Sequence, residues 1–176
     1  MSSTNDATVI AAGKFLQLLS REGWEFVHRP NITGIVAVVA ITDAREMILV
    51  EQYRIPVAKK VIEIPAGLAG DIEDEENESL ETAAARELRE EAGYTALKME
   101  FLTQGPPSAG MSTEEISFFR ARGLKKESHG GGDESEEITV HLVPLDTIDK
   151  WLKQREQQGC LVDPKVYTAL YFAGKP

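Results

Sequence analysis

The nine residues from Arg86 to Tyr94, RELREEAGY, are the most informative stretch of the chain. They end a segment, residues 79–92, whose apolar side chains recur about one helical turn apart. This spacing predicts an amphipathic helix with one buried face, formed by Leu80, Ala84, Leu88 and Ala92. Gly93 follows, at the position where a glycine commonly ends a helix. The stretch is therefore expected to form the last turns of a helix and its C-terminal stop.

Three glutamates, Glu87, Glu90 and Glu91, lie near the C-terminal end of this helix, where the helix dipole is already negative. Glu87 and Glu91 are four residues apart on one face, and such like-charged pairs cost about 0.2–0.5 kcal/mol. The cluster either accepts this cost in solvent or holds a cation, since Mg²⁺ and Mn²⁺ prefer carboxylate oxygens. Arg86 and Arg89 could neutralise the same charges, so the spacing alone leaves an ion-pair cluster and a metal site both open.

Acids are also concentrated just upstream, at six of the eight positions from Asp71 to Glu78. Acidic side chains near a helix N-terminus complement its dipole, and runs of charge usually face solvent. The run lacks the alternating ligands and the central glycine of an EF-hand, which excludes a calcium-binding loop of that type. We therefore expect most of this run to be a solvated surface.

The composition limits the class of protein. The 176 residues correspond to about one domain, and 42% hydrophobic with 27% charged residues is typical of a globular chain. A net charge of −10 disfavours nucleic acid as a partner, because phosphate backbones are repelled. No apolar run approaches the roughly 20 residues that span a bilayer, so no membrane partner is expected. Cys160 is the one cysteine and the start lacks the features of a secretory signal, which together predict a cytoplasmic protein.

Short β-branched and aromatic segments elsewhere predict strands. Residues 14–19 and 24–29 flank a turn-prone tetrapeptide and predict an N-terminal hairpin, after a frayed start at 1–12. The run from Ile32 to Ile41 is almost continuously apolar, which is typical of a strand buried on both faces. Further strands are expected at 47–53, 61–64, 97–102, 116–121 and 138–143, and further helices at 146–158 and 163–172. Few helices among many strands predict an α+β fold.

The stretch from Arg86 to Tyr94 resembles the second half of the Nudix box, REUxEExGU, in which U is an aliphatic or bulky apolar residue. The upstream glutamate of that pattern corresponds to Glu78, which we expect to form an ion pair near the helix start. The opening glycine departs from the pattern. Five residues should separate it from Glu78, but seven follow Gly70 and ten follow Gly67. A longer loop costs little free energy, so the departure leaves the metal-facing half of the box intact.

Four other motifs occur in the order found in the ADP-ribose pyrophosphatase branch of this family, which also contains nucleoside-diphosphate-sugar hydrolases. They are Glu51–Arg54, Glu63–Gly67, Ser108–Gly110 with Glu114, and Glu134–Ile138. The resemblance covers about residues 13–172. It implies a Nudix α/β/α sandwich with a mixed sheet at 31–176, preceded by a small N-terminal antiparallel hairpin or sheet at 1–30. In relatives such a sheet swaps across a two-fold dimer, which implies a homodimer through the N-terminal strands.

The resemblance also implies a Mg²⁺ site, with Mn²⁺ as a substitute. Glu87 and Glu91 are then the core ligands, and Glu90 is a ligand or supports one. The main-chain carbonyl of Ala66 completes the coordination, at what we expect to be a tight Pro-Ala-Gly turn. Arg86 is expected to pair with a neighbouring glutamate and fix its rotamer, which places Arg86 and Glu90 in the catalytic group.

The general base of this branch comes from a loop outside the box, so the carboxylates after the triple glycine 130–132 are the candidates. Alignment makes Glu134 the base and Glu136 an added metal contact, with Glu137 facing solvent. The glycines would allow the loop to close over substrate. Composition alone would instead predict a disordered acidic loop without a catalytic role. Which of Glu134 and Glu136 is the general base stays open.

Substrate contacts are implied at four further places. Arg54 is expected to grip a phosphate or ribose through its guanidinium, and Glu114 to bond sugar hydroxyls. Trp24 is expected either to stack on the base or, with Phe26, to belong to the hairpin core. The turn at residues 108–110 supplies the remaining expected substrate contacts.

In that turn Ser108 and Gly110 are expected to contact substrate, and Ala109 replaces the usual proline that accompanies ADP-ribose preference. Strict selectivity for ADP-ribose is therefore in doubt, and other nucleoside diphosphate sugars remain candidate substrates. The resemblance predicts Mg²⁺-dependent hydrolysis of the pyrophosphate bond of ADP-ribose or a related nucleoside diphosphate sugar, giving a nucleoside monophosphate and a sugar phosphate. The alternative is a Nudix-fold sensor that binds a nucleotide sugar without cleaving it. A pure binder has no need of a costly carboxylate cluster, which favours the hydrolase.

Overall fold

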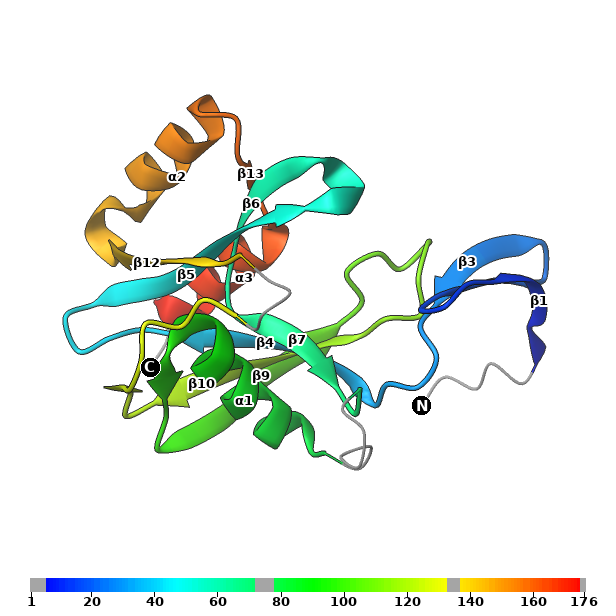
Figure 1. The fold of residues 1–176 in the computed structure, drawn as a ribbon, viewed down its shortest axis with the longest axis horizontal. Coiled ribbons are helices and arrows are strands. Elements are labelled where there is room, and N and C mark those ends of the chain that lie inside the picture. The colour runs from blue at the N-terminus through cyan, green and yellow to red at the C-terminus, as the bar shows by residue number, and fades with distance from the viewer. Residues whose placement is uncertain (1–5, 72–77, 133–136, 175–176) are drawn as a thin grey trace.

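The computed structural model describes residues 6–71, 78–132 and 137–174. Its helices are α1 (Leu80–Ala92), α2 (Ile148–Gln157) and α3 (Pro164–Ala173), with short 3₁₀ turns at Ile55–Val57 and Leu145–Thr147. Its strands are β1 (Thr8–Ala12), β2 (Gln17–Arg21), β3 (Trp24–His28), β4 (Gly34–Ala40), β5 (Glu46–Arg54), β6 (Lys59–Glu63), β7 (Ala66–Ala69), β8 (Tyr94–Thr95), β9 (Lys98–Gly105), β10 (Ile116–Arg122), β11 (Lys125–Lys126), β12 (Thr139–Pro144) and β13 (Leu161–Val162) (Figure 1).

These strands form two four-stranded sheets, ordered β7-β4-β10-β9 and β12-β5-β6-β13, besides the N-terminal sheet β1-β2-β3 and the small pair β11-β8. β10 runs parallel to β4 and β13 runs parallel to β6, whereas the other neighbours are antiparallel. Both four-stranded sheets are therefore mixed. The predicted α+β fold with a mixed sheet and a small antiparallel N-terminal sheet is confirmed.

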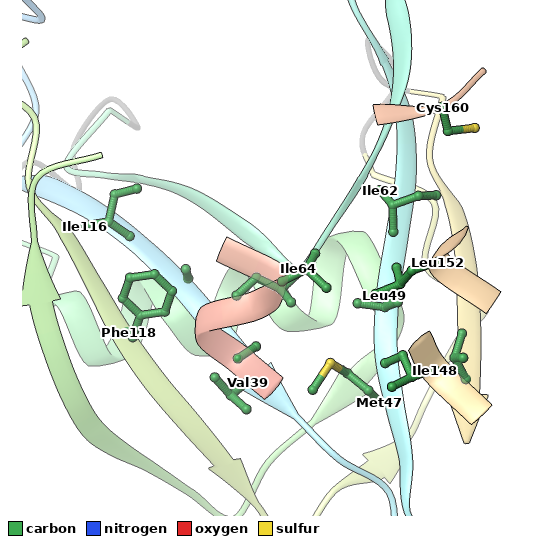
Figure 2. Close-up of a cluster of buried hydrophobic side chains, with 14 residues drawn as sticks. Val39, Met47, Leu49, Ile62, Ile64, Ile116, Phe118, Ile148, Leu152 and Cys160 are labelled. Atoms are coloured by element: carbon green, nitrogen blue, oxygen red, sulfur yellow. The ribbon is translucent and has the colours of Figure 1, made fainter. Parts of the chain in front are cut away.

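Strand β4 divides the interior into two hydrophobic clusters. Val36, Val38 and Ala40 point to one side, where they pack with the apolar face of α1. Ala37 and Val39 point to the other side, where α2 and α3 cover the cluster drawn in Figure 2. All five side chains are fully buried, so the strand predicted to be buried on both faces is confirmed. The two helical layers therefore meet the sheets from opposite faces of β4.

Both ends of α1 have the local chemistry that the sequence predicts. The Ser79 hydroxyl caps the helix by accepting the Thr82 N–H at 3.1 Å. Gly93 adopts a left-handed conformation, φ 76°, and its N–H donates to the Arg89 carbonyl. A Cβ at Gly93 would also collide with the main chain of Ser128. The ends of the helix, and hence the positions of its glutamates, are well specified.

The N-terminal sheet has one more strand than the predicted hairpin. The expectation of a frayed start at 1–12 is wrong for Thr8–Ala12, which pairs antiparallel with β2. All five residues of β1 are exposed, and their sequence, TVIAA, lacks the alternation of apolar and polar residues that reveals a half-buried strand. Val27 ties the sheet to the main body, since its N–H donates to the Met111 carbonyl and its carbonyl accepts the Thr113 N–H. The division of the chain at residues 30 and 31 stays a prediction.

Two other local expectations are wrong. The tight turn expected at residues 65–67 is the start of β7, because Ala66 and Gly67 pair with β4 in an antiparallel ladder. The helix expected from 146 begins at Ile148, after a 3₁₀ turn, and the side chain of its N-cap residue, Thr147, makes no capping hydrogen bond. The first difference matters for the site, because an edge strand presents main-chain groups in a fixed direction.

Candidate active site

Helix α1 lies against the free edge of β7 and bonds to it twice. Glu91, 3% exposed, accepts the Ala66 N–H at 3.0 Å through Oε2. Two residues along the strand, the Leu68 carbonyl accepts a hydrogen bond of 2.8 Å from Arg86 Nη2. The N–H and C=O of one residue in an extended strand point to the same side. The Ala66 carbonyl is therefore directed toward the glutamates of α1.

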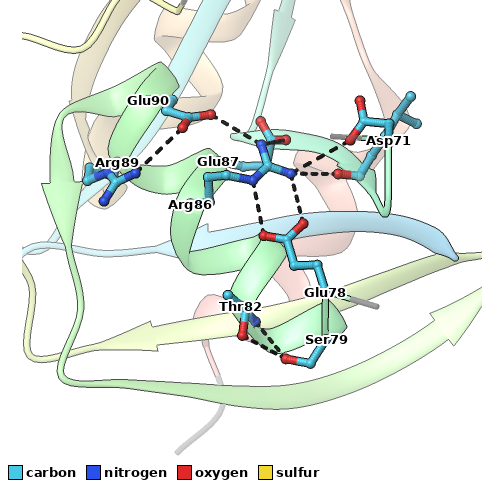
Figure 3. Close-up of polar contacts among 9 residues, drawn as sticks. Asp71, Glu78, Ser79, Thr82, Arg86, Glu87, Arg89 and Glu90 are labelled. Carbon is cyan, nitrogen blue, oxygen red and sulfur yellow. Dashed lines mark hydrogen bonds and ion pairs between the residues drawn. The ribbon is translucent and has the colours of Figure 1, made fainter. Parts of the chain in front are cut away.

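Arg86 is the centre of an acidic cluster (Figure 3). Its Nε and Nη2 donate to the two carboxylate oxygens of Glu78, each at 3.1 Å, in a bidentate pair. Its Nη1 donates to Glu87 at 2.8 Å and to Glu90 at 3.2 Å. Burial lowers the pKa of Arg86, but the Glu78 and Glu87 carboxylates outweigh this and raise it overall. The arginine therefore stays charged and fixes the glutamate side chains around it, as predicted from the sequence.

Glu87 is held close to the main chain of β7. Its carboxylate lies where a Cβ at Gly67 would be, so any larger residue at this position would overlap it. No positive φ is involved, so glycine is needed here for the close approach alone. The motif 63–67 contains the signal, but sequence reasoning assigned that glycine to a turn.

Burial raises the pKa of Glu87 to about 7, and the neighbouring Glu90 and Asp71 add to the shift, although Arg86 opposes it. Burial therefore disfavours the charged form of Glu87 more than the nearby Arg86 favours it. Among residues 6–71, 78–132 and 137–174, no three His, Cys, Asp or Glu side chains already converge on one point as a metal site. The Arg86 guanidinium bonds to both Glu87 and Glu90 in this arrangement. The donors nevertheless suit a hard divalent cation, because they are carboxylates beside a main-chain carbonyl.

The raised pKa of Glu87 predicts a pH-dependent stability of the metal-free protein. The folded state keeps the Glu87 proton to about pH 7, whereas the ordinary value is 4.5. The unfolding free energy should therefore fall as the pH rises from about 4.5 through about 7. Glu87→Gln should remove this fall and be more stable than wild type at pH 8, by about 1–3 kcal/mol. Urea unfolding in the presence of a chelator across this pH range measures the unfolding free energy of both proteins. If the unfolding free energies of wild type and Glu87→Gln changed with pH in parallel, Glu87 would not be the group responsible.

The cluster forms one wall of a pocket of about 720 Å³. The described residues lining it include three acids of α1, Glu87, Glu90 and Glu91, and two predicted substrate contacts, Arg54 and Glu114. Arg54 is paired through Nε, at 2.9 Å, with the buried carboxylate of Glu63. Glu114 accepts a hydrogen bond from Arg29 at 3.2 Å. The fold therefore brings together predicted metal ligands and substrate contacts that are up to 60 positions apart in the chain.

The predicted aromatic contact lies in an adjoining pocket of about 350 Å³, which shares Glu114 with the first. Trp24 lines it with 65% of its surface exposed, so it is not part of a hairpin core. Gly110 also lines this pocket, close to the Trp24 ring. Ser108 is exposed and its carbonyl accepts the N–H groups of residues 111 and 112, so it shapes the turn.

Sequence reasoning missed two cations of the larger pocket, Arg29 and Lys165. Neither lies in a motif, and each enters through long-range packing. Glu134 and Glu136, the predicted base and added metal contact, lie outside the described residues, and Glu137 is exposed as expected.

Comparison with known proteins identifies the family. Residues 32–162 match the model of the NUDIX domain. The chain belongs to the Nudix family. It is 37% identical over 149 residues to the methanol dehydrogenase activator of Bacillus methanolicus, covering 84% of this chain and 74% of that protein. It is 38% identical over 133 residues to the ADP-ribose pyrophosphatase of Bacillus subtilis strain 168, covering 75% and 68% of the two chains.

A solved structure described as an ADP compounds hydrolase has the same fold, with a TM-score of 0.65 at 24% identity, covering 84% of this chain and 80% of the other. This Nudix chain is thus a hydrolase by family, and Nudix hydrolases use divalent metal cations. Within the described part of the chain, no helix is long and apolar enough to cross a membrane.

Proposed function

We propose that this Nudix hydrolase cleaves the pyrophosphate bond of ADP-ribose or a related nucleoside diphosphate sugar with Mg²⁺, giving a nucleoside monophosphate and a sugar phosphate. The observation that carries the proposal is the pairing of the α1 glutamates with the edge of β7, on the wall of a pocket that also contains Arg54. A diphosphate needs positive charge to enter so acidic a pocket.

Glu87, Glu91 and the Ala66 carbonyl are the groups that would hold the cation, with Glu90 beside them. Mn²⁺ has the same preference for oxygen ligands and would substitute. When bound, such a cation clamps the diphosphate and lowers the pKa of a bound water. Arg86 keeps the glutamates in place through its four hydrogen bonds to carboxylates.

Other residues of the two pockets orient the substrate. The Arg54 guanidinium would bind a phosphate, and Glu114, at the junction of the pockets, would accept hydrogen bonds from ribose hydroxyls. Trp24, beside Gly110, would stack on the base. Glu134 remains our proposed general base and Glu136 an added metal contact, on the strength of their alignment alone.

We also propose a homodimer that acts in the cytoplasm. Besides Trp24, four large apolar side chains of the N-terminal region are at least 41% exposed: Val9, Ile10, Phe15 and Leu16. A monomer rarely leaves so many together without a partner. A second copy of the sheet would cover them.

The alternative is binding without cleavage, and one relative is named as an activator of another enzyme. The carboxylate cluster of α1 favours hydrolysis, because a protein that only binds has no need of it. A panel of ADP-ribose, ADP-glucose, GDP-mannose and UDP-glucose with Mg²⁺, with products identified by mass, separates the two. We expect AMP and ribose 5-phosphate from ADP-ribose and no reaction with a chelator. Tight binding of a nucleotide sugar without turnover in either Mg²⁺ or Mn²⁺ would establish the alternative.

A further inference from the structure

Lys165 is the cation of the larger pocket that enters from α3. Asp163, the N-cap of this helix, accepts the Lys165 main-chain N–H at 2.7 Å through Oδ1. Its second oxygen, Oδ2, accepts a hydrogen bond of 2.6 Å from the Lys165 ammonium. The lysine side chain is 19% exposed. An aspartate that already caps the helix thus also fixes the direction of the lysine side chain.

The sheet places this pair next to a second pair of the same kind. β13 runs parallel to β6 with Val162 opposite Ile62, and the Asp163 N–H donates to the Ile62 carbonyl at 2.9 Å. Asp163 therefore follows β13 at the level where Glu63 ends β6. Glu63 holds Arg54 at 2.8 Å. Two acids, one ending β6 and one directly following β13, therefore each hold one cation at the same pocket.

The charges around the pocket fall into two groups. Arg29 and Arg86 bond to acids that line the pocket themselves, Glu114, Glu87 and Glu90, so their charges are compensated inside it. The partners of Arg54 and Lys165 do not line the pocket. Of each pair, therefore, only the cation lines the cavity. An ammonium group has three donors and Asp163 takes one, which leaves the group able to bind an anion.

We propose that Lys165 contacts a phosphate of the substrate and forms, with Arg54, a two-cation clamp on the side of the pocket away from the α1 glutamates. This inference rests on the proposed function for the identity of the anion, a nucleoside diphosphate. Because α1 and α3 pack on opposite faces of β4, the clamp and the proposed metal ligands reach the diphosphate from different directions. The clamp supplies positive charge that does not depend on metal.

The variant Lys165→Met tests the inference, since it keeps the aliphatic stem and removes the ammonium group. ADP in Mg²⁺, checked by mass to remain intact, and adenosine serve as probes in calorimetric titrations. We expect the Kd for ADP to rise about tenfold, because a hydrogen bond to a charged group is lost. The Kd for adenosine should change less than twofold, and the dependence of ADP binding on salt should weaken. Lys165→Arg should restore ADP binding to within about threefold.

Lys153→Met is the matched control, because Lys153 is exposed on α2 and outside the pocket lining. It should leave both Kd values unchanged. An unchanged ADP affinity in Lys165→Met, an equal loss for ADP and adenosine, or a wild type that binds no ADP would each overturn the inference. A wild type that binds ADP through Lys165 but cleaves no nucleoside diphosphate sugar would overturn the proposed hydrolysis alone.

Discussion

Glu91→Gln should lower kcat by at least about 1,000-fold, equivalent to about 4 kcal/mol of barrier, while the fold persists. The glutamate is 3% exposed and accepts the Ala66 N–H, and a glutamine oxygen can accept the same hydrogen bond. The substitution therefore removes the charge and can keep this hydrogen bond. That charge is one of those proposed to hold Mg²⁺, whose stabilisation of a diphosphate transition state is worth several kcal/mol. Initial rates with ADP-ribose over a range of Mg²⁺ concentrations measure the effect.

A charge-matched control lies on the same helix. Glu81 is in the first turn of α1 and exposed, so Glu81→Gln removes an equal charge away from β7. Its turnover should stay within about twofold of wild type, as for ordinary surface substitutions. Thermal unfolding of both variants shows whether they are folded. Turnover of Glu91→Gln above a tenth of the wild-type value would show that this carboxylate does not hold the metal.

Local chemistry accounts for the parts of the molecule that the sequence predicts well. Helix α1 differs from its predicted range by one residue, because Ser79 and Gly93 act within one turn of its ends. The buried strand around Val38 is predicted equally well, because apolar residues on both faces leave a continuous run. Both features need no knowledge of distant residues. The bounds of the helix that carries the glutamates can therefore be predicted from the sequence alone.

The parts that were missed depend on tertiary contacts. The exposed strand β1 has no hydrophobic pattern of its own, and pairing with β2 alone makes it a strand. Gly67 looks like a turn residue until Glu87, twenty positions later, is packed against it. Lys165 is an ordinary helical lysine until β13 pairs with β6 and brings it to the pocket of α1. Residue spacing along the chain cannot predict these contacts between distant segments.

Arg86→Met should lower the unfolding free energy by about 3–5 kcal/mol, because it leaves buried carboxylates without their counter-charge. The Glu78 side chain is 3% exposed and Glu87 13%, and Arg86 bonds to both. The Leu68 carbonyl would lose its hydrogen bond from the same guanidinium. The methionine keeps the apolar stem, so the loss reports the charge and its hydrogen bonds. Urea unfolding at pH 8 measures the change.

The neighbouring Arg89 provides a matched control for Arg86→Met. Arg89 is 57% exposed and has an ion pair of 3.6 Å with Glu90, so Arg89→Met should cost no more than about 1 kcal/mol. Adding Glu78→Gln to Arg86→Met should recover part of the loss, because the second substitution removes the carboxylate that was left unpaired. Equal costs for the two arginine variants, or no recovery in the double variant, would mean that Arg86 does not hold the acidic cluster together. The glutamates would then depend on the cation itself for their arrangement.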